Sequence, residues 1–361
     1  MDAQTSQTPL INLKQFKKDL PFLTEETHKN ELENISDTDV RFIDLFAGIG
    51  GIRRSFEDAG ARCVFSSEID VNAQYTYYSN YGVVPFGDIK QIDTDAIPDH
   101  DILCAGFPCQ PFSYIGQREG FEHPTQGTMF HEILRILTKK RPKVVFLENV
   151  PGLLNHDEGR TLAIILESLS KLGYVCSHTL LNSKDFGVPQ SRSRFYLVGV
   201  LAPQDEESKG APSGRFTFPV PPDIHVDIGD YLESNVEGYS VSEYFQKSYL
   251  FKKDDGLPTM IDKTTKGPAR TLCATYYKIQ RLTGSFVRDG STGVRTLSVN
   301  ECKAMMGFPE DFIIPVCKTQ MYRQLGNSVV VTVVTSIAKK IMADIFPEGR
   351  RIALGQEKFH S

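Results

Sequence analysis

The strand–turn–helix segment over residues 41–60 constrains the fold more than any other part of the chain. RFIDLF predicts a buried strand, AGIGG a tight turn, and IRRSFEDAG a helix with apolar Ile52, Phe56 and Ala59 that ends at Gly60. Glycines at such a turn let a ligand approach the backbone at a helix N-terminus. Further buried strands alternate with helices up to residue 202, which predicts an α/β fold with a largely parallel sheet.

Two carboxylates follow the next predicted strands. Glu68 ends the strand CVFSSEID, twenty positions after Gly48, and Asp88 follows a third short strand. An acidic residue at about that distance holds ribose hydroxyls in Rossmann-like folds. The turn lacks the third glycine of the dinucleotide motif, and no Lys-Ser/Thr pair follows to make a P-loop. These residues favour a nucleoside cofactor without phosphates, a description that S-adenosylmethionine fits.

A cysteine lies in a proline-bounded corner at the end of the strand predicted over residues 102–107. Pro108 and Pro111 fix the backbone φ angle on both sides of Cys109. Most cysteines are small buried hydrophobic residues, but this one lies where ligands bind in parallel sheets. Glu148 ends the following buried strand and favours a nucleophile at Cys109. Residues 108–127 are polar and glycine-containing, typical of a loop that closes over a substrate.

The composition indicates the cellular compartment in which the protein works. The seven cysteines are scattered, with no Cys-x-x-Cys pair, which favours a reducing compartment and argues against disulfides or a zinc site. No apolar run approaches the roughly 18 residues needed to span a membrane. The first ten residues lack the features of a signal peptide. We therefore expect a cytoplasmic protein without a membrane or metal partner.

Charge is distributed unevenly along the chain. The net charge is −5, with eight acidic and four basic residues in 1–40, but residues 250–295 hold nine Lys/Arg against four Asp. That basic segment is either a phosphate-binding surface or merely a solvated face. From about Pro203 the sequence becomes linker-like, and residues 216–294 read as short strands and turns.

These changes predict the domain organisation. We expect an N-terminal extension with some helix (1–39), a core domain (40–202 plus 296–346), a linker with a second domain (203–295), and a C-terminal tail (347–361). An edge hairpin over residues 174–202 carries Arg192 and Arg194 on one face. One long helix over 322–346, with Asn327 at its start, packs back on the core domain.

Five motifs, FIDLFAGIGG, GFPCQPFS, ENV, QSRSRFYLVG and YRQLGNSVVV, follow one another in this order. With them the chain resembles the DNA (cytosine-5)-methyltransferases of the prokaryotic restriction–modification type, from about Arg41 to Phe346. The resemblance implies a Rossmann-like, S-adenosylmethionine-dependent methyltransferase domain and a smaller, mostly β or irregular target-recognition domain. It also implies methyl transfer to carbon 5 of a cytosine flipped out of a specific double-stranded DNA sequence, through a covalent Cys–cytosine intermediate.

The resemblance also assigns roles to residues of this chain. Cys109 is the thiolate that adds to carbon 6, and Glu148, bound in its protonated form, donates to N3 of the base and holds the exocyclic amine. Arg194 contacts the cytosine carbonyl, and Arg192 is its companion near the cysteine loop. The implied cofactor residues are Phe46, Gly48, Ile49 and Gly51 in the glycine turn, Glu68 at the ribose with Ile69 stacking on the adenine, Asp88 and Ile89 at the adenine edge, and Pro108 and Asn327, which complete the pocket.

DNA contacts are expected from two segments. Gln110 and Ser113 belong to the loop that closes on the vacated space in the duplex. The second domain carries side chains suited to phosphates and base edges, namely Thr271, Tyr276, Tyr277, Lys278, Gln280, Arg281 and Arg288.

Alternatives remain open on the residues alone. The tRNA branch of the same family shares the motifs, although some 80 residues of second domain favour DNA. A nicotinamide-dependent oxidoreductase would share the strand–turn–helix, and a non-catalytic DNA-binding relative would share the fold. We expect a monomer that acts on double-stranded DNA and is associated with the nucleoid when bound. Whether a restriction endonuclease acts on the same site is left open.

Overall fold

The computed structural model describes residues 11–33, 35–107, 129–203, 215–222 and 224–347. Within them the main sheet has six strands in the order β2-β1-β3-β4-β6-β5. Strands β2, β1, β3 and β4 are parallel, whereas β6 and β5 form an antiparallel hairpin at one edge. Their bounds are β1 Arg41–Leu45, β2 Arg62–Ser67, β3 Ile102–Gly106, β4 Val144–Asn149, β5 Tyr174–Asn182 and β6 Ser193–Leu201.

The strand order determines where a ligand can bind. The chain leaves β1 toward β2 on one side and returns to place β3 on the other, so the order reverses between β1 and β3. In open α/β sheets the ligand crevice lies outside the carboxyl ends of the strands at this point. The predicted α/β fold is confirmed, and the glycine turn after β1 and the end of β3 border that crevice.

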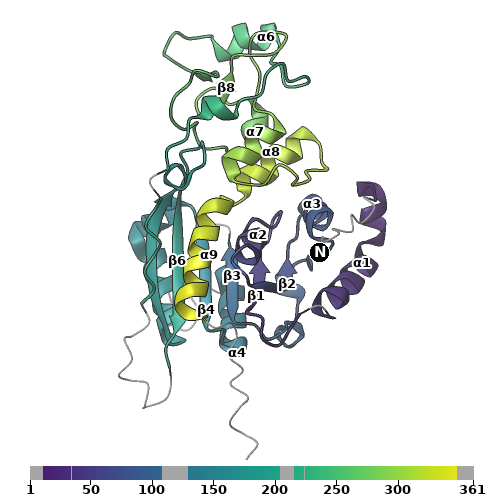
Figure 1. The fold of residues 1–361 in the computed structure, drawn as a ribbon, viewed down its shortest axis with the longest axis vertical. Coiled ribbons are helices and arrows are strands. Elements are labelled where there is room, and N and C mark those ends of the chain that lie inside the picture. Colours follow the sequence, from purple (N-terminus) through teal and green to yellow (C-terminus); the bar gives the residue numbers. More distant parts are fainter. Residues whose placement is uncertain (1–10, 34, 108–128, 204–214, 223, 348–361) are drawn as a thin grey trace, which may run out of the picture.

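Helices cover both faces of the sheet (Figure 1). On one face, α2 (Gly51–Glu57) and α9 (Val331–Ile345) bury Phe56 and Val334 against Phe42 of β1. On the other, α4 (Met129–Lys140) and α5 (Arg160–Lys171) pack on a separate apolar cluster that contains Ile43. Adjacent residues of β1 thus enter opposite layers, as the alternation of side chains along a strand requires.

The N-terminal extension contains the expected helix. Helix α1 (Leu13–Glu33) lies beside β2 and α3 (Val71–Tyr81), where Phe16 packs against Tyr75 and Tyr78 (Figure 1). Short 3-10 helices join the larger elements and span Ile89–Gln91, Thr94–Ala96, Pro151–Leu154, His156–Gly159, Ser183–Phe186, Ile228–Tyr231 and Tyr276–Lys278. A π-helix, Gln246–Leu250, follows α6. No helix in the described part of the chain is long and apolar enough to cross a membrane.

The region predicted as a second domain has little regular structure, as expected. It contains α6 (Glu243–Phe245) and a two-stranded sheet of β7 (Thr259–Ile261) and β8 (Ser285–Val287) with its own small apolar cluster. Helices α7 (Val299–Met306) and α8 (Lys318–Asn327) lie between this region and the main sheet in Figure 1. The domain boundaries themselves stay predictions.

Two local expectations were wrong. The segment 322–346 is not one helix, because α8 ends at Asn327 and α9 begins at Val331; Ser328 between them is extended, with φ −71° and ψ 161°. Asn327 therefore ends a helix instead of starting one. The third short strand before Asp88 is only an isolated bridge between Ser67 and Phe86.

Candidate active site

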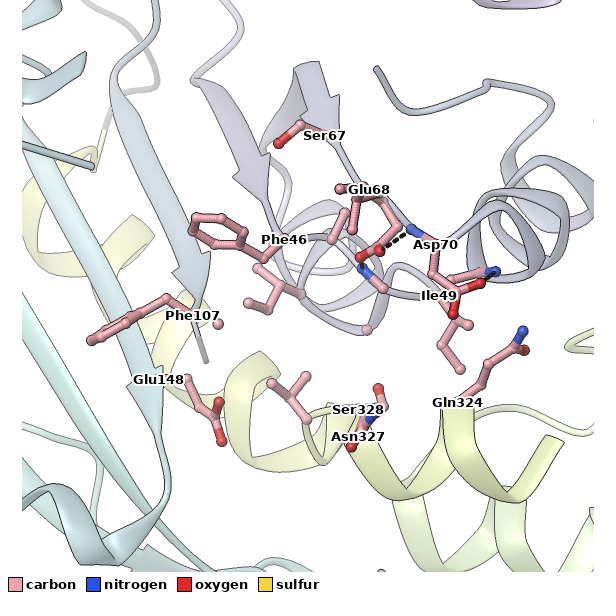
Figure 2. A pocket seen from close by; sticks show the side chains of 18 of the residues that line it. Phe46, Ile49, Ser67, Glu68, Asp70, Phe107, Glu148, Gln324, Asn327 and Ser328 are labelled. Carbon is pink, nitrogen blue, oxygen red and sulfur yellow. Dashed lines mark hydrogen bonds between the residues drawn. The ribbon is translucent and has the colours of Figure 1, made fainter. Parts of the chain in front are cut away.

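A cavity of about 780 Å³ lies at the carboxyl ends of the parallel strands. Figure 2 shows walls from the glycine turn, the ends of β2, β3 and β4, and the junction between α8 and α9. The start of β6 adds Arg192 and Arg194. The cavity is therefore in the crevice that the strand order predicts.

The glycine turn forms one wall of this cavity. Phe46 and Gly48 have φ angles of 58° and 57°, in the left-handed region. The Gly48 amide donates to Glu68 Oε2 at 2.8 Å, and the Asp70 amide donates to Glu68 Oε1 at 2.7 Å. No atom lies within 4 Å of a Cβ built on Gly48, so the cavity is open at that point. The turn and the end of β2 are thus locked together by one carboxylate.

Burial raises the pKa of Glu68, and the backbone hydrogen bonds from Asp70 and Gly48 oppose that rise. The carboxylate keeps further lone pairs for a ligand, since each oxygen accepts only one of these hydrogen bonds. Glu68 is therefore positioned to accept from ligand hydroxyls while it holds the turn.

The other predicted cofactor residues meet in the same cavity. Ile69 is 69% exposed at its rim, and Asp88 lines the wall while it accepts from the Lys90 amide at 3.1 Å. The cavity brings together all nine predicted cofactor residues that the structure describes: Phe46, Gly48, Ile49, Gly51, Glu68, Ile69, Asp88, Ile89 and Asn327. Ile89 contributes mainly backbone, because its side chain is buried in the core. Pro108 lies outside the described residues.

Glu148 and Arg194 occupy the other part of the cavity. Arg194 Nε lies 3.3 Å from Glu148 Oε1, and both side chains are largely buried. Burial raises the pKa of Glu148, while the charges of Arg194 and Arg192 lower it. Gly106 pairs with Glu148 in the sheet, and a Cβ built on Gly106 would lie 3.6 Å from Glu148 Oε2. The site therefore places a carboxyl group, whose burial favours the protonated form, next to a cation.

The guanidinium of Arg192 is already bonded to backbone carbonyls and is not directed at a ligand in the way expected of a substrate-binding cation. This buried guanidinium donates to the carbonyls of Leu272, Gly326 and Ser328 at 2.8, 2.8 and 2.9 Å. Burial and then the nearby Arg194 charge lower its pKa to about 10, so it stays charged at neutral pH. Arg192 thus joins the α8–α9 junction to the predicted recognition region. Cys109, Gln110 and Ser113 lie outside the described residues, so the structure does not place them.

Two of the predicted DNA contacts are corrected by their burial. Tyr276 is 3% exposed, and its hydroxyl donates to the Ser285 carbonyl and accepts from the Leu297 amide. Arg281 is 7% exposed, pairs with Asp255 and donates to three backbone carbonyls. The polar groups of both side chains bond to partners inside the recognition region, as buried polar groups must, which argues against the predicted DNA contacts.

The remaining predicted contacts lie at or near the surface. Lys278 and Arg288 are exposed, and Arg288 Nη1 is 3.9 Å from Asp262. Gln280 accepts from the Thr275 hydroxyl at 2.9 Å, and Thr271 donates to the Ser191 carbonyl at 2.7 Å.

The sequence analysis missed several cavity-lining residues. Gln324 and Arg323 precede Asn327 on α8, and Ser328 and Val329 follow it. Helical spacing offered a signal for Arg323, which lies one turn before Asn327. Phe107 lines the cavity from the end of β3 and was treated only as part of a strand.

These features define a class of fold, the Rossmann-like α/β domains with a ligand cavity at the carboxyl ends of their parallel strands. Solved structures support the fold. The Dnmt2 methyltransferase of S. pombe matches with a TM-score of 0.66 and 23% identity over 84% of this chain and 98% of that one. The methyltransferase EhMeth of Entamoeba histolytica matches with the same TM-score and identity over 85% and 98%.

Sequence comparison then identifies the family. The profile described as C-5 cytosine-specific DNA methylase matches residues 40–343. The Type II methyltransferase M.MspI of Moraxella sp is 61% identical over 91% of this chain and 77% of its own length. M.BsuFI of Bacillus subtilis is 52% identical over 82% and 71%, and M.HhaI of Haemophilus parahaemolyticus is 38% identical over 86% and 97%. The chain belongs to the C-5 cytosine-specific DNA methylase family and is a DNA (cytosine-5)-methyltransferase, which removes the oxidoreductase and the non-catalytic alternatives.

Proposed function

We propose that this methyltransferase binds S-adenosylmethionine in the described cavity and methylates carbon 5 of a cytosine that has left the DNA duplex. The observation that carries the proposal is the joining of two different environments in one cavity. Glu68 and Asp88 line one part, and the Glu148–Arg194 pair lines the other. A cofactor and a base bound in these two parts would be held next to each other.

The residues present fit this cofactor. The turn around Gly48 is open to the cavity, and Glu68 and Asp88 offer acceptors for hydroxyl and amino groups. Exposed Ile69 offers an apolar surface for a ring, and Asn327 offers an amide to the amino-acid end. When bound, S-adenosylmethionine supplies an electrophilic methyl group. The chain's own residues orient it and prepare the base.

Carbon 5 of cytosine is too electron-poor to attack that methyl group unaided. Addition of the Cys109 thiolate to carbon 6 makes carbon 5 an enamine-like nucleophile. Charge then develops toward N3, where protonated Glu148 donates its proton, and the buried position of Glu148 favours the protonated form. Arg194 binds the cytosine carbonyl oxygen. After methyl transfer the carbon 5 proton passes to a base such as water, the thiolate leaves carbon 6, and the N3 proton returns to Glu148, which restores the ring.

The target base must leave the duplex to enter a cavity of this kind, at a cost of a few kcal/mol. We assign sequence recognition to the 203–295 region, where Lys278 and Arg288 are exposed. The named relatives are Type II methyltransferases, so we further propose a restriction–modification role in which a nuclease shares the same site.

A mechanism-based trap tests the proposal. Fluorine on carbon 5 cannot leave as a cation, so a duplex with 5-fluorocytosine at the target should form a denaturant-stable adduct when S-adenosylmethionine is present. Peptide mapping should place the adduct on Cys109, and Cys109→Ser should give none. An adduct with fluorinated tRNA but not with DNA would overturn the DNA substrate. The lack of any adduct would remove Cys109 from its role.

A further inference from the structure

The back of the glycine turn is held by a tyrosine that does not line the cavity. Gly50, with a φ angle of 83°, accepts a hydrogen bond at 2.6 Å from the Tyr81 hydroxyl on α3. A Cβ built on Gly50 would lie 2.3 Å from the Tyr81 ring. The ring therefore packs directly against the turn, and neither residue is among those that line the cavity.

A buried arginine lies over the same tyrosine. The Arg53 guanidinium on α2 is 4.7 Å from the centroid of the Tyr81 ring, and its Nη1 donates to the Tyr77 hydroxyl at 3.2 Å. Cation–π contacts are stronger when the cation is desolvated, as it is here. A buried guanidinium also requires a counter-charge, because an unpaired buried charge is strongly destabilising.

The N-terminal extension supplies part of that counter-charge. Glu31 of α1 lies 2.6 Å from Arg53, and both side chains are 8% exposed; Glu57 of α2 pairs with Arg53 at 2.9 Å. His28, 3.6 Å from Glu31, also faces this cluster, and burial lowers the pKa of His28 to about 4. His28 is therefore neutral near pH 7 and leaves the Glu31 carboxylate to Arg53.

These contacts connect α1 to the glycine turn, from Glu31 to Arg53, from Arg53 to Tyr81 and from Tyr81 to Gly50. We propose that Glu31, Arg53 and Tyr81 are positioning residues for the cofactor, and that α1 is a functional part of the cofactor site. A turn that contains left-handed residues competes with other backbone conformations. Affinity falls in proportion to the fraction of molecules in the binding-competent conformation, so contacts that favour this turn raise affinity without touching the ligand. The inference rests on the proposed binding of S-adenosylmethionine in this cavity.

Removal of one hydroxyl group tests the first step. Tyr81→Phe keeps the ring and deletes the hydrogen bond to Gly50, and we expect the dissociation constant for S-adenosylmethionine, measured by calorimetry, to rise about threefold to tenfold. Tyr174→Phe is the matched control, because Tyr174 is 2% exposed and its hydroxyl donates to the Pro142 carbonyl at 2.7 Å, on strand β5 at the sheet edge opposite β2 and α1. That control should bind the cofactor as the wild type does. In steady-state kinetics of Tyr81→Phe, the KM for S-adenosylmethionine should rise by a similar factor, with a smaller change in the turnover number.

A double-mutant cycle tests the link to α1. Glu31→Gln should also raise the dissociation constant, and the control Glu33→Gln, at an exposed position of the same helix, should not. If Arg53 connects the two residues, the combined Glu31→Gln and Tyr81→Phe change should weaken binding by less than the product of the single effects.

The outcomes separate the two proposals. A wild-type protein that does not bind S-adenosylmethionine would overturn the proposed function. If the wild type binds but Tyr81→Phe matches Tyr174→Phe, the positioning role of Tyr81 is refuted. If the effects of Glu31→Gln and Tyr81→Phe simply multiply, the path through Arg53 is refuted.

Discussion

Replacement of Glu148 by glutamine separates base binding from proton donation. A protonated glutamate presents one O–H donor and one carbonyl acceptor, and a glutamine presents an N–H donor and a carbonyl acceptor. Both can bind N3 and the exocyclic amine of cytosine. Only the glutamate can release its proton to N3 as charge develops there. Glu148→Gln should therefore retain base binding and lose catalysis.

The size of the loss follows from the role. A positioned general acid contributes roughly 10²–10⁴ in rate, about 3–5 kcal/mol of the barrier. Arg194, which lies 3.3 Å from Glu148 Oε1, loses an ionic partner in the variant but remains available for the cytosine carbonyl. We therefore expect the single-turnover rate to fall by two to four orders of magnitude with little change in affinity for the target duplex.

The pH dependence gives a second readout. Burial raises the pKa of Glu148, and the ionised form cannot donate to N3. In the wild type, affinity for the flipped base should fall about tenfold per pH unit above that pKa. The fall should be absent in Glu148→Gln, because an amide does not ionise.

The assay is single-turnover transfer of a labelled methyl group to a target duplex, together with duplex binding, across a pH series. Glu167→Gln is the control, since Glu167 pairs with Lys171 at 2.9 Å on the exposed side of α5. A Glu148→Gln variant with the wild-type rate, or one that keeps the wild-type pH slope in binding, would refute the reasoning.

Three further predictions address other parts of the molecule. Glu68→Ala should weaken S-adenosylmethionine binding at least tenfold in calorimetry with the fold intact, since a hydrogen bond to a charged group is worth about 1.5–3 kcal/mol; unchanged affinity would put the cofactor elsewhere. Lys278→Ala should lower affinity for all duplex sequences and reduce the salt slope by about one, whereas a change confined to one sequence would contradict a phosphate contact. Asp44 lies in β1, and burial raises its pKa to about 8 from the ordinary 3.8. The folded state therefore binds this proton more tightly than the unfolded state, so the free energy of unfolding should fall as the pH rises from about 4 to 8. Asp44→Asn should flatten that decline in denaturant unfolding, and an unchanged pH profile would show that Asp44 is not its cause.

The cofactor half of the site was predictable because its signals are local. Apolar runs that stop at Gly48 and Glu68 indicate both the strand and the end at which the polar side chain emerges. Parallel strands bring such ends to one edge whatever the details of packing. The cavity therefore contains the predicted residues even though the strand expected before Asp88 did not form.

The recognition region was less predictable because its sequence has no repeating pattern of apolar and polar residues that would show which side chains are buried. In a basic, loop-rich segment, the sequence gives no reason to rank one candidate DNA contact above another among Tyr276, Arg281, Lys278 and Arg288. The structure buries the first two and exposes the others. Burial there depends on distant partners such as Asp255, twenty-six residues before Arg281, and nothing in the local pattern identifies them.

The sequence by itself determined the class of the fold and the family, because these depend on short motifs at strand ends. Tertiary structure decided what long-range contacts control. It broke the helix expected over 322–346 at Ser328, where Arg192 holds the carbonyls on both sides of Asn327. It also paired Glu31 of the N-terminal extension with Arg53, which lies beside the glycine turn. A buried charge takes its partner from whatever element packs against it, and that neighbour is known only once the chain has folded.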